Sequence, residues 1–230
     1  MPYVIGLCGG ISAGKSTFAQ DAAIIVEEKG FIPIIIDATK NIKKQINEVC
    51  PYTDIDSNIA AQSLLYTKFV EILYDFLDPF YVLEARYPKQ KKFVIITTRT
   101  PLDHVYYLTE LNKQQNGGAD TDRMLDAAIL FCAKFYSGII FFGESYSDVP
   151  DKWKFLKNSG KYLYEKCADP LLDLPLEDFT EDKSLEERVE IFKENTFPEF
   201  KKGFKDSLDM SSYYVDRPIW LVKGFFYVSE

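Results

Sequence analysis

The chain has 230 residues, with 35 acidic side chains against 27 lysines and arginines, and a formal net charge of −8. Such an acidic chain gains nothing from counterion release on DNA or RNA, so polynucleotide binding is disfavoured. Its length suits one domain, and its 47% hydrophobic content is that of an ordinary globular protein. The four cysteines contain no Cys-x-x-Cys pair, which favours reduced thiols over a disulfide framework or a zinc site.

Nothing in the sequence predicts secretion or insertion into a membrane. The apolar runs, such as Gly138–Phe142, are too short to cross a bilayer, and the first residues do not follow a signal-peptide pattern. We therefore expect a cytoplasmic protein without a membrane partner.

Strands and helices are predicted to alternate along the first two thirds of the chain. Short apolar runs predict buried strands, and longer stretches with apolar residues at helical spacing predict helices. In chain order the predictions are a strand at Tyr3–Cys8, a helix at Lys15–Lys29, a strand at Phe31–Ile36, a helix at Ala38–Val49, a loop at Pro51–Asn58, a helix at Ile59–Leu77, a strand at Phe93–Thr97, helices at Pro101–Asn112 and Thr121–Phe135, and a strand at Gly138–Phe142. The second strand lacks alternation, which predicts burial on both faces. Pro79 is expected to end or kink the third helix.

The last third of the chain is less regular. Three prolines among mixed charges predict an irregular insertion at 144–183. Ser184-Leu185-Glu186-Glu187 is a capping box that predicts a helix to about Phe197, and Ile219–Val222 is a last apolar strand. The whole order predicts an α/β fold: a mostly parallel five-stranded sheet with helices on both faces, in a single domain over 1–230.

Residues 9–16 form a phosphate-binding motif. Gly9-Gly10-Ile11-Ser12-Ala13-Gly14-Lys15-Ser16 matches G-x-x-x-x-G-K-[ST] between a predicted strand and a predicted helix. The glycines let backbone N–H groups point at the β-phosphate, and the helix N-terminus adds a partial positive charge. Lys15 places its charge on the β- and γ-phosphates, Ser16 offers a hydroxyl to Mg²⁺, and Thr17 can bond the α-phosphate. A glycine-rich turn that binds nothing is the alternative, but the flanking elements favour binding of ATP or GTP with Mg²⁺ in a three-layer P-loop NTPase sandwich.

Charged residues follow the second and third predicted strands, where α/β sheets bind their ligands. Asp37 is placed to reach Mg²⁺ and a substrate hydroxyl, and it could orient the nucleophile or accept its proton. The alternative is that Asp37 caps the following helix. Arg99 is placed to bind a phosphate or a transferring phosphoryl group, with Asp103 holding it one turn later. The alternative is a structural Arg–Asp pair at a helix start.

The chain lacks the N-K-x-D and D-x-x-G motifs of signalling GTPases and the strand ending in Asp-Glu of energy-coupling ATPases. Thr98-Arg99-Thr100-Pro101-Leu102-Asp103, followed by Val105-Tyr106-Tyr107, resembles the D-R-[ST]-P-[LI]-D…Y segment of the ribosylnicotinamide-kinase-like P-loop group. It is similar, more loosely, to the E-R-S segment of deoxynucleoside kinases. Tyr136–Phe142 is similar to the Y-D-x-V-F-hydrophobic strand of the first group, and Gly6–Gly10 resembles the opening of dephospho-coenzyme A kinase.

The resemblance covers the phosphate-binding motif and two later strands, mainly within residues 1–143. It implies transfer of the ATP γ-phosphoryl group to a nucleoside, a nucleoside monophosphate or a related small metabolite. In the first functional hypothesis, Lys15 and Arg99 stabilise the transferring group and Asp37 orients the acceptor, with Ser16 and Asp37 on Mg²⁺. Asp103 joins Asp37 and Arg99 as a substrate-binding residue. The family acid before the arginine is Thr98 here, so the catalytic base is unassigned.

Such kinases usually close an arginine-bearing lid, for which Arg123, counted among the substrate-binding residues, and Arg188 are candidates. Each has a solvated helix charge as its alternative. His104 is the single histidine, which makes triad chemistry hard to build, and it is expected on a helix surface.

The competing functional hypothesis is a nucleotide-dependent regulatory ATPase or GTPase, or a binding module without a small-molecule acceptor. The sequence names neither the acceptor nor the preferred nucleotide, and it leaves a homodimer open.

Overall fold

Five parallel strands form one sheet in the order β2-β3-β1-β4-β5. The computed structural model describes residues 3–86, 92–143, 156, 159–171, 174–181 and 183–202, with the backbone alone at 81–86 and 201–202. The strands are β1 (Tyr3–Gly9), β2 (Ile32–Ile36), β3 (Phe93–Thr97), β4 (Gly138–Phe142) and β5 (Leu176–Phe179). The prediction of an α/β fold with a parallel sheet is confirmed.

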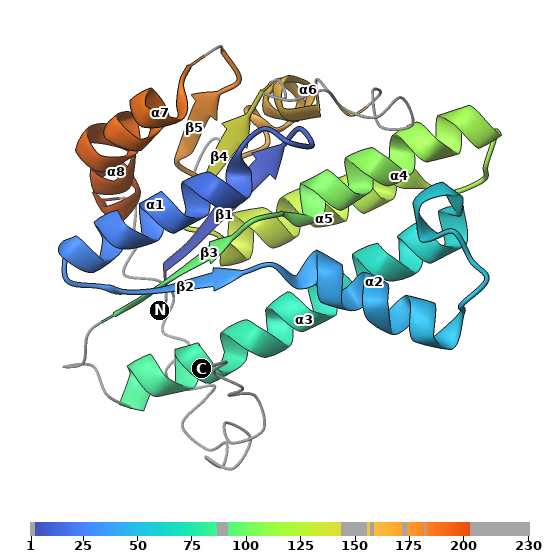
Figure 1. The fold of residues 1–230 in the computed structure, drawn as a ribbon, viewed down its shortest axis with the longest axis horizontal. Coiled ribbons are helices and arrows are strands. Elements are labelled where there is room, and N and C mark those ends of the chain that lie inside the picture. Colours follow the sequence, from blue (N-terminus) through green and yellow to red (C-terminus); the bar gives the residue numbers. More distant parts are fainter. Residues whose placement is uncertain are drawn as a thin grey trace.

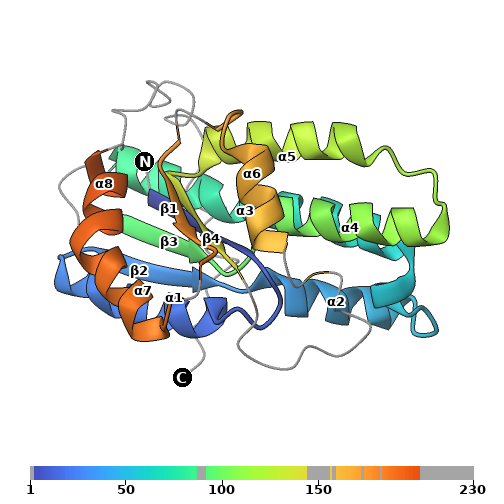
Figure 2. The same ribbon diagram turned by 90° about the horizontal axis from the view of Figure 1, so that it is seen from above.

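Helices cover both faces of the sheet (Figures 1 and 2). Those in the described part of the chain are α1 (Lys15–Glu28), α2 (Ala38–Val49), α3 (Ile59–Arg86), α4 (Pro101–Gln115), α5 (Thr121–Phe135), α6 (Ser159–Cys167), α7 (Leu185–Ile191) and α8 (Phe197–Lys202). A 3-10 turn at Ile55–Ser57 precedes α3, and a π-helical stretch at Phe192–Thr196 joins α7 to α8. Helices α1, α7 and α8 lie on one face, and α3 to α6 lie on the other.

Two apolar cores hold these layers together. On the α1 face, Phe18 packs edge-to-face against Phe142, Phe179 and Phe192, with ring centroids 5.2 to 5.8 Å apart. On the other face, one stripe of α3 is buried against α2, α4 and the sheet. Because β1 and β4 are buried on both faces, their continuous apolar runs fit the centre of a parallel sheet.

The exposure of strand β2 differs from its prediction. It lies at the edge of the sheet, and Ile32 and Ile35 are 38% and 41% exposed, so burial on both faces is wrong. An apolar run does not reveal where its strand falls in the sheet order, because long-range topology sets that order.

Pro79 does not end the third helix, because α3 continues through it to Arg86. Leu73, Leu77 and Phe80, on either side of the proline, are almost fully buried. Their burial stabilises the helix by more than the roughly 3 kcal/mol that an interior proline costs.

The described part of the predicted insertion at 144–183 is not irregular, because it contains α6 and β5. Charged Glu177 and Asp178 interrupt the apolar pattern of β5, which hides this strand in the sequence. The predicted strand at Ile219–Val222 lies outside the described residues. Within those residues, no helix has both the length and the apolar character that a membrane span requires.

Candidate functional site

The loop between β1 and α1 is curled by unusual backbone angles. The φ angles are +123° at Gly9, +57° at Ser12 and +82° at Gly14, all in the region that favours glycine. A Cβ atom on Gly9 would lie 2.1 Å from the carbonyl oxygen of Phe142, so no other residue fits there without moving β4. This loop therefore depends on the glycines of the sequence motif.

Lys15 lies across this loop in the structure. Its Nζ donates to the carbonyl oxygens of Gly9, at 2.6 Å, and Gly10, at 2.5 Å, and the side chain is buried. Burial and, to a smaller extent, the nearby Arg99 charge together lower the pKa of Lys15 to about 7, against an opposing effect of Asp103.

Asp103, in the first turn of α4, holds the start of the loop. Its Oδ1 accepts from the Gly9 N–H at 2.8 Å, and its Oδ2 accepts from the N–H and hydroxyl of Thr100 at 2.7 and 2.9 Å. Burial favours the neutral acid, but Lys15, Arg99 and the two N–H groups together outweigh it, so the pKa of Asp103 is lowered. The carboxylate is thus held ionised between β1 and α4.

Arg99 follows β3 and points toward the same glycine. Its Nη1 donates to the Gly9 carbonyl oxygen at 3.2 Å and lies 3.4 Å from Asp103 Oδ1. The predicted contact between Arg99 and Asp103 is therefore present. The side chains of Lys15 and Arg99 thus both donate to the Gly9 carbonyl oxygen. An anionic ligand could take the place of this oxygen as the acceptor for both cations.

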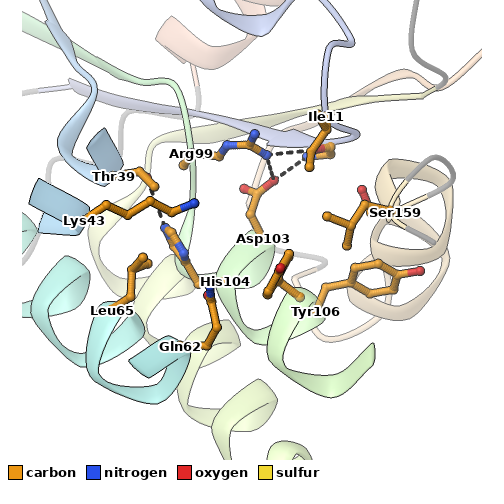
Figure 3. Close-up of a pocket in the computed structure, with 13 residues that line it drawn as sticks. Ile11, Thr39, Lys43, Gln62, Leu65, Arg99, Asp103, His104, Tyr106 and Ser159 are labelled. Carbon is orange, nitrogen blue, oxygen red and sulfur yellow. Dashed lines mark hydrogen bonds and ion pairs between the residues drawn. The ribbon is translucent and has the colours of Figure 1, made fainter. Parts of the chain in front are cut away.

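Two cavities adjoin at Arg99. The loop cavity, of about 520 Å³, is lined by Ser12 to Thr17, by Asp37 and Lys40, and by Thr98. The helical cavity, of about 280 Å³, lies among α2, α3, α4 and α6 (Figure 3). Thr39, Lys43 and Arg99 line both cavities, so these three side chains form their junction.

His104 is buried in the wall of the helical cavity, which overturns the prediction of a surface histidine. Its Nε2 lies 3.4 Å from the Thr39 hydroxyl, and its ring packs on Phe69 with centroids 4.4 Å apart. The pKa of His104 is lowered to about 3, mainly by burial and to a smaller extent by the charges of Arg99 and Lys43, against an opposing effect of Asp103. The ring is therefore neutral at physiological pH.

We expect His104 to make the protein sensitive to acid. Its folded-state pKa is lowered from 6.5 to about 3, so the unfolded chain binds the extra proton and stability falls as the pH drops through this window. A tenfold change in an acid constant corresponds to about 1.4 kcal/mol, which bounds the loss at about 5 kcal/mol. Chemical denaturation at several pH values should show that the free energy of unfolding falls less steeply with decreasing pH for His104→Gln than for the wild type. Equal slopes would contradict the assignment.

Three side chains that line the helical cavity, those of Lys43, Gln62 and Tyr107, also hold the segment before α3. Lys43 Nζ lies 2.5 Å from Asp56 Oδ1, and the Tyr107 hydroxyl donates to the Asp56 carbonyl oxygen at 2.5 Å. Gln62, whose side chain also lines the cavity, donates to the carbonyl oxygen of Ile55 at 2.8 Å. Side chains of α2, α3 and α4 thus fix this segment in place.

Other predicted residues are placed as follows. Asp37 is exposed at the start of α2, makes no capping hydrogen bond with its side chain, and lines the loop cavity together with Ser16. Gly9 and Ile11 line the helical cavity. Arg123 is exposed, pairs with Asp120 at 3.2 Å, and lines neither cavity.

Arg188 is neither a solvated charge nor on a lid in this structure. It is almost fully buried, its Nη1 donates to the Ala13 carbonyl oxygen at 3.2 Å, and its guanidinium lies 5.3 Å from the Phe142 ring centroid. It therefore supports the loop from the α7 side.

Several lining residues were not singled out from the sequence: Thr39, Lys43 and Gln62. Thr39 and Lys43 stand four positions apart just after a strand end, a spacing that puts both on one helix face above the ligand region. That signal could have found them.

Oxygen donors suited to Mg²⁺ line the loop cavity. Ser16 supplies a hydroxyl and Asp37 a carboxylate, and Mg²⁺ takes few protein ligands when phosphates complete its shell. The described part of the chain contains no cluster of three or more His, Cys, Asp or Glu residues for a metal held by protein alone.

No protein-family model matches the chain, and no curated protein is significantly similar to it.

Proposed function

We propose that this chain is an ATP- and Mg²⁺-dependent phosphotransferase whose acceptor is a nucleoside, a nucleoside monophosphate or a related small metabolite. The observation that carries the proposal is the pair of adjoining cavities. One is lined by the glycine-rich loop, the other by side chains of four helices, and Arg99 lines both. A donor in the first and an acceptor in the second would meet at Arg99.

The fold in this proposal is the P-loop NTPase sandwich. It is supported by a parallel sheet in which β1 is central and leads into the loop motif and α1. Backbone N–H groups and the α1 N-terminus would bind the phosphates of the nucleotide.

In this mechanism Lys15 leaves the carbonyl oxygens of Gly9 and Gly10 and binds the β- and γ-phosphates. Arg99, at the junction, stabilises charge on the transferring group. Asp103 positions Arg99 and the loop. Ser16 and Asp37 would hold Mg²⁺, which supplies charge neutralisation on the phosphates.

The proposal is tested by ADP release with ATP and Mg²⁺ against a panel of small acceptors. We expect one acceptor to stimulate release, and Arg99→Ala to lower turnover by about 10²- to 10³-fold while ATP binding persists. Arg123→Ala is the matched control, because Arg123 lines neither cavity. The turnover of this variant should equal that of the wild type. Slow hydrolysis that no acceptor stimulates would instead support a regulatory nucleotide-binding protein.

A further inference from the structure

We infer that the acceptor atom is an oxygen of a phosphate monoester, and that a neutral hydroxyl group is not the acceptor. The inference rests on the proposed function and narrows its substrate class. It follows from the charges at the junction of the two cavities and from the lack of a general base among the described residues that line the helical cavity.

The junction carries two cations. Lys43 and Arg99 line both cavities and come from different elements, α2 and the end of β3. Together with Lys15 they would face a donor phosphate on one side and the acceptor on the other. A phosphate monoester carries close to two negative charges at neutral pH, which two such cations stabilise, whereas a neutral hydroxyl gains little from the second.

No described residue of the helical cavity is fit to remove a proton. Asp103 is the one carboxylate that lines it among the described residues, and its oxygens accept from Gly9 and Thr100 and contact Arg99. These contacts keep the pKa of Asp103 low, and the pKa of His104 is about 3, so both are weak bases. Asp37 lines the loop cavity but not the helical one.

Lys43 can take a phosphate without leaving a buried charge behind. It pairs with Asp56, and the two side chains are 34% and 27% exposed, so water reaches this pair. Ion pairs of this kind contribute little and exchange partners readily. Asp56 would stay solvated when Lys43 turns to the ligand.

The chemistry balances without a base. A dianionic monoester oxygen attacks the γ-phosphorus of ATP, a new phosphoanhydride P–O bond forms, and the bond between the β–γ bridging oxygen and the γ-phosphorus breaks. That bridging oxygen keeps the electron pair as ADP leaves. The attacking oxygen carries no proton, so none is released, whereas a hydroxyl acceptor would release one proton for each ADP formed.

The experiment uses matched pairs of acceptors: common nucleosides and deoxynucleosides, nicotinamide riboside included, each beside its 5′-monophosphate. ADP release is measured for every member, and phosphorus NMR identifies the new bond in the product. We expect a monophosphate to stimulate release at least about 100-fold over its parent nucleoside, to give a phosphoanhydride, and to release no proton in weak buffer at about pH 8.

Two lysine variants test the role of Lys43. Lys43→Ala should raise the KM for the monophosphate about tenfold or more, while Lys44→Ala, exposed on the same helix and outside both cavities, should leave it unchanged. A nucleoside that stimulates release while its monophosphate does not would overturn this inference and leave the phosphotransferase proposal standing. If ATP binds and no acceptor of either kind stimulates release, both are overturned.

Discussion

Replacing Asp103 by alanine is expected to lower the free energy of unfolding by about 3–4 kcal/mol and to abolish tight ATP binding. The carboxylate is buried and accepts from the Gly9 N–H and from both donors of Thr100, and it balances the charges of Lys15 and Arg99. Alanine would leave buried donors without acceptors and two cations near each other without their anion. Urea denaturation and nucleotide titration would measure the two effects.

Asp120→Ala is the matched control for this experiment. Asp120 also stands at the start of a helix, where its side chain accepts from the Arg123 N–H, but it is 59% exposed. Its loss should cost about 1 kcal/mol and leave ATP binding unchanged. Similar losses in the two variants would show that Asp103 acts only as a helix cap.

Replacing Lys15 by methionine should lower activity without lowering stability, in contrast to the replacement of Asp103. Turnover should fall by about 10²- to 10³-fold or more, because the loop loses its charge on the β- and γ-phosphates. Stability should be maintained or should rise, because burial and the Arg99 charge make protonated Lys15 unfavourable in the folded chain. Lys29→Met, at the other end of α1 and exposed, should change neither quantity.

The lowered pKa of Lys15 also predicts how stability and ATP affinity change with pH. The pKa of Lys15 is lowered from 10.5 to about 7, so the unfolded chain binds more protons in this window and the wild type gains stability as the pH rises through it. Bound phosphates favour the charged amine and raise its pKa, so ATP binding should take up a proton just above pH 7 and weaken as the pH rises. Calorimetry in buffers of different ionisation enthalpy measures that uptake. Proton uptake that persists in Lys15→Met would contradict the assignment.

Local patterns in the sequence predict much of the fold and the loop of the site. The bounds of α2, α5, β3 and β4 match their predictions because each depends on the spacing of apolar residues and on neighbouring helix or strand ends. The glycine-rich loop is predicted for the same reason, since its backbone needs residues at fixed positions. The placement of Asp37 and Arg99 beside it follows from the rule that parallel strands end at one edge.

The rest depends on contacts between distant parts of the chain. The sequence predicts His104 and Arg188 as polar or charged side chains on helix surfaces. Both are buried, because α3 brings Phe69 against His104 and β4 brings Phe142 against Arg188. The helix through Pro79 likewise depends on tertiary packing. The helical cavity itself combines residues from four helices, and no local pattern predicts which side chains will face one another.

The main chain of Gly9 would link the two substrates of the proposed reaction. Its N–H is bonded to Asp103 on α4, one position before His104, and its carbonyl oxygen accepts from Lys15 on α1. In the proposed reaction, a nucleotide that draws Lys15 away would alter the field around a residue that α4 also holds, so occupancy of the loop cavity would change the wall of the helical cavity. Thermodynamic linkage then requires reciprocity: the factor by which the donor alters acceptor affinity equals the factor by which the acceptor alters donor affinity.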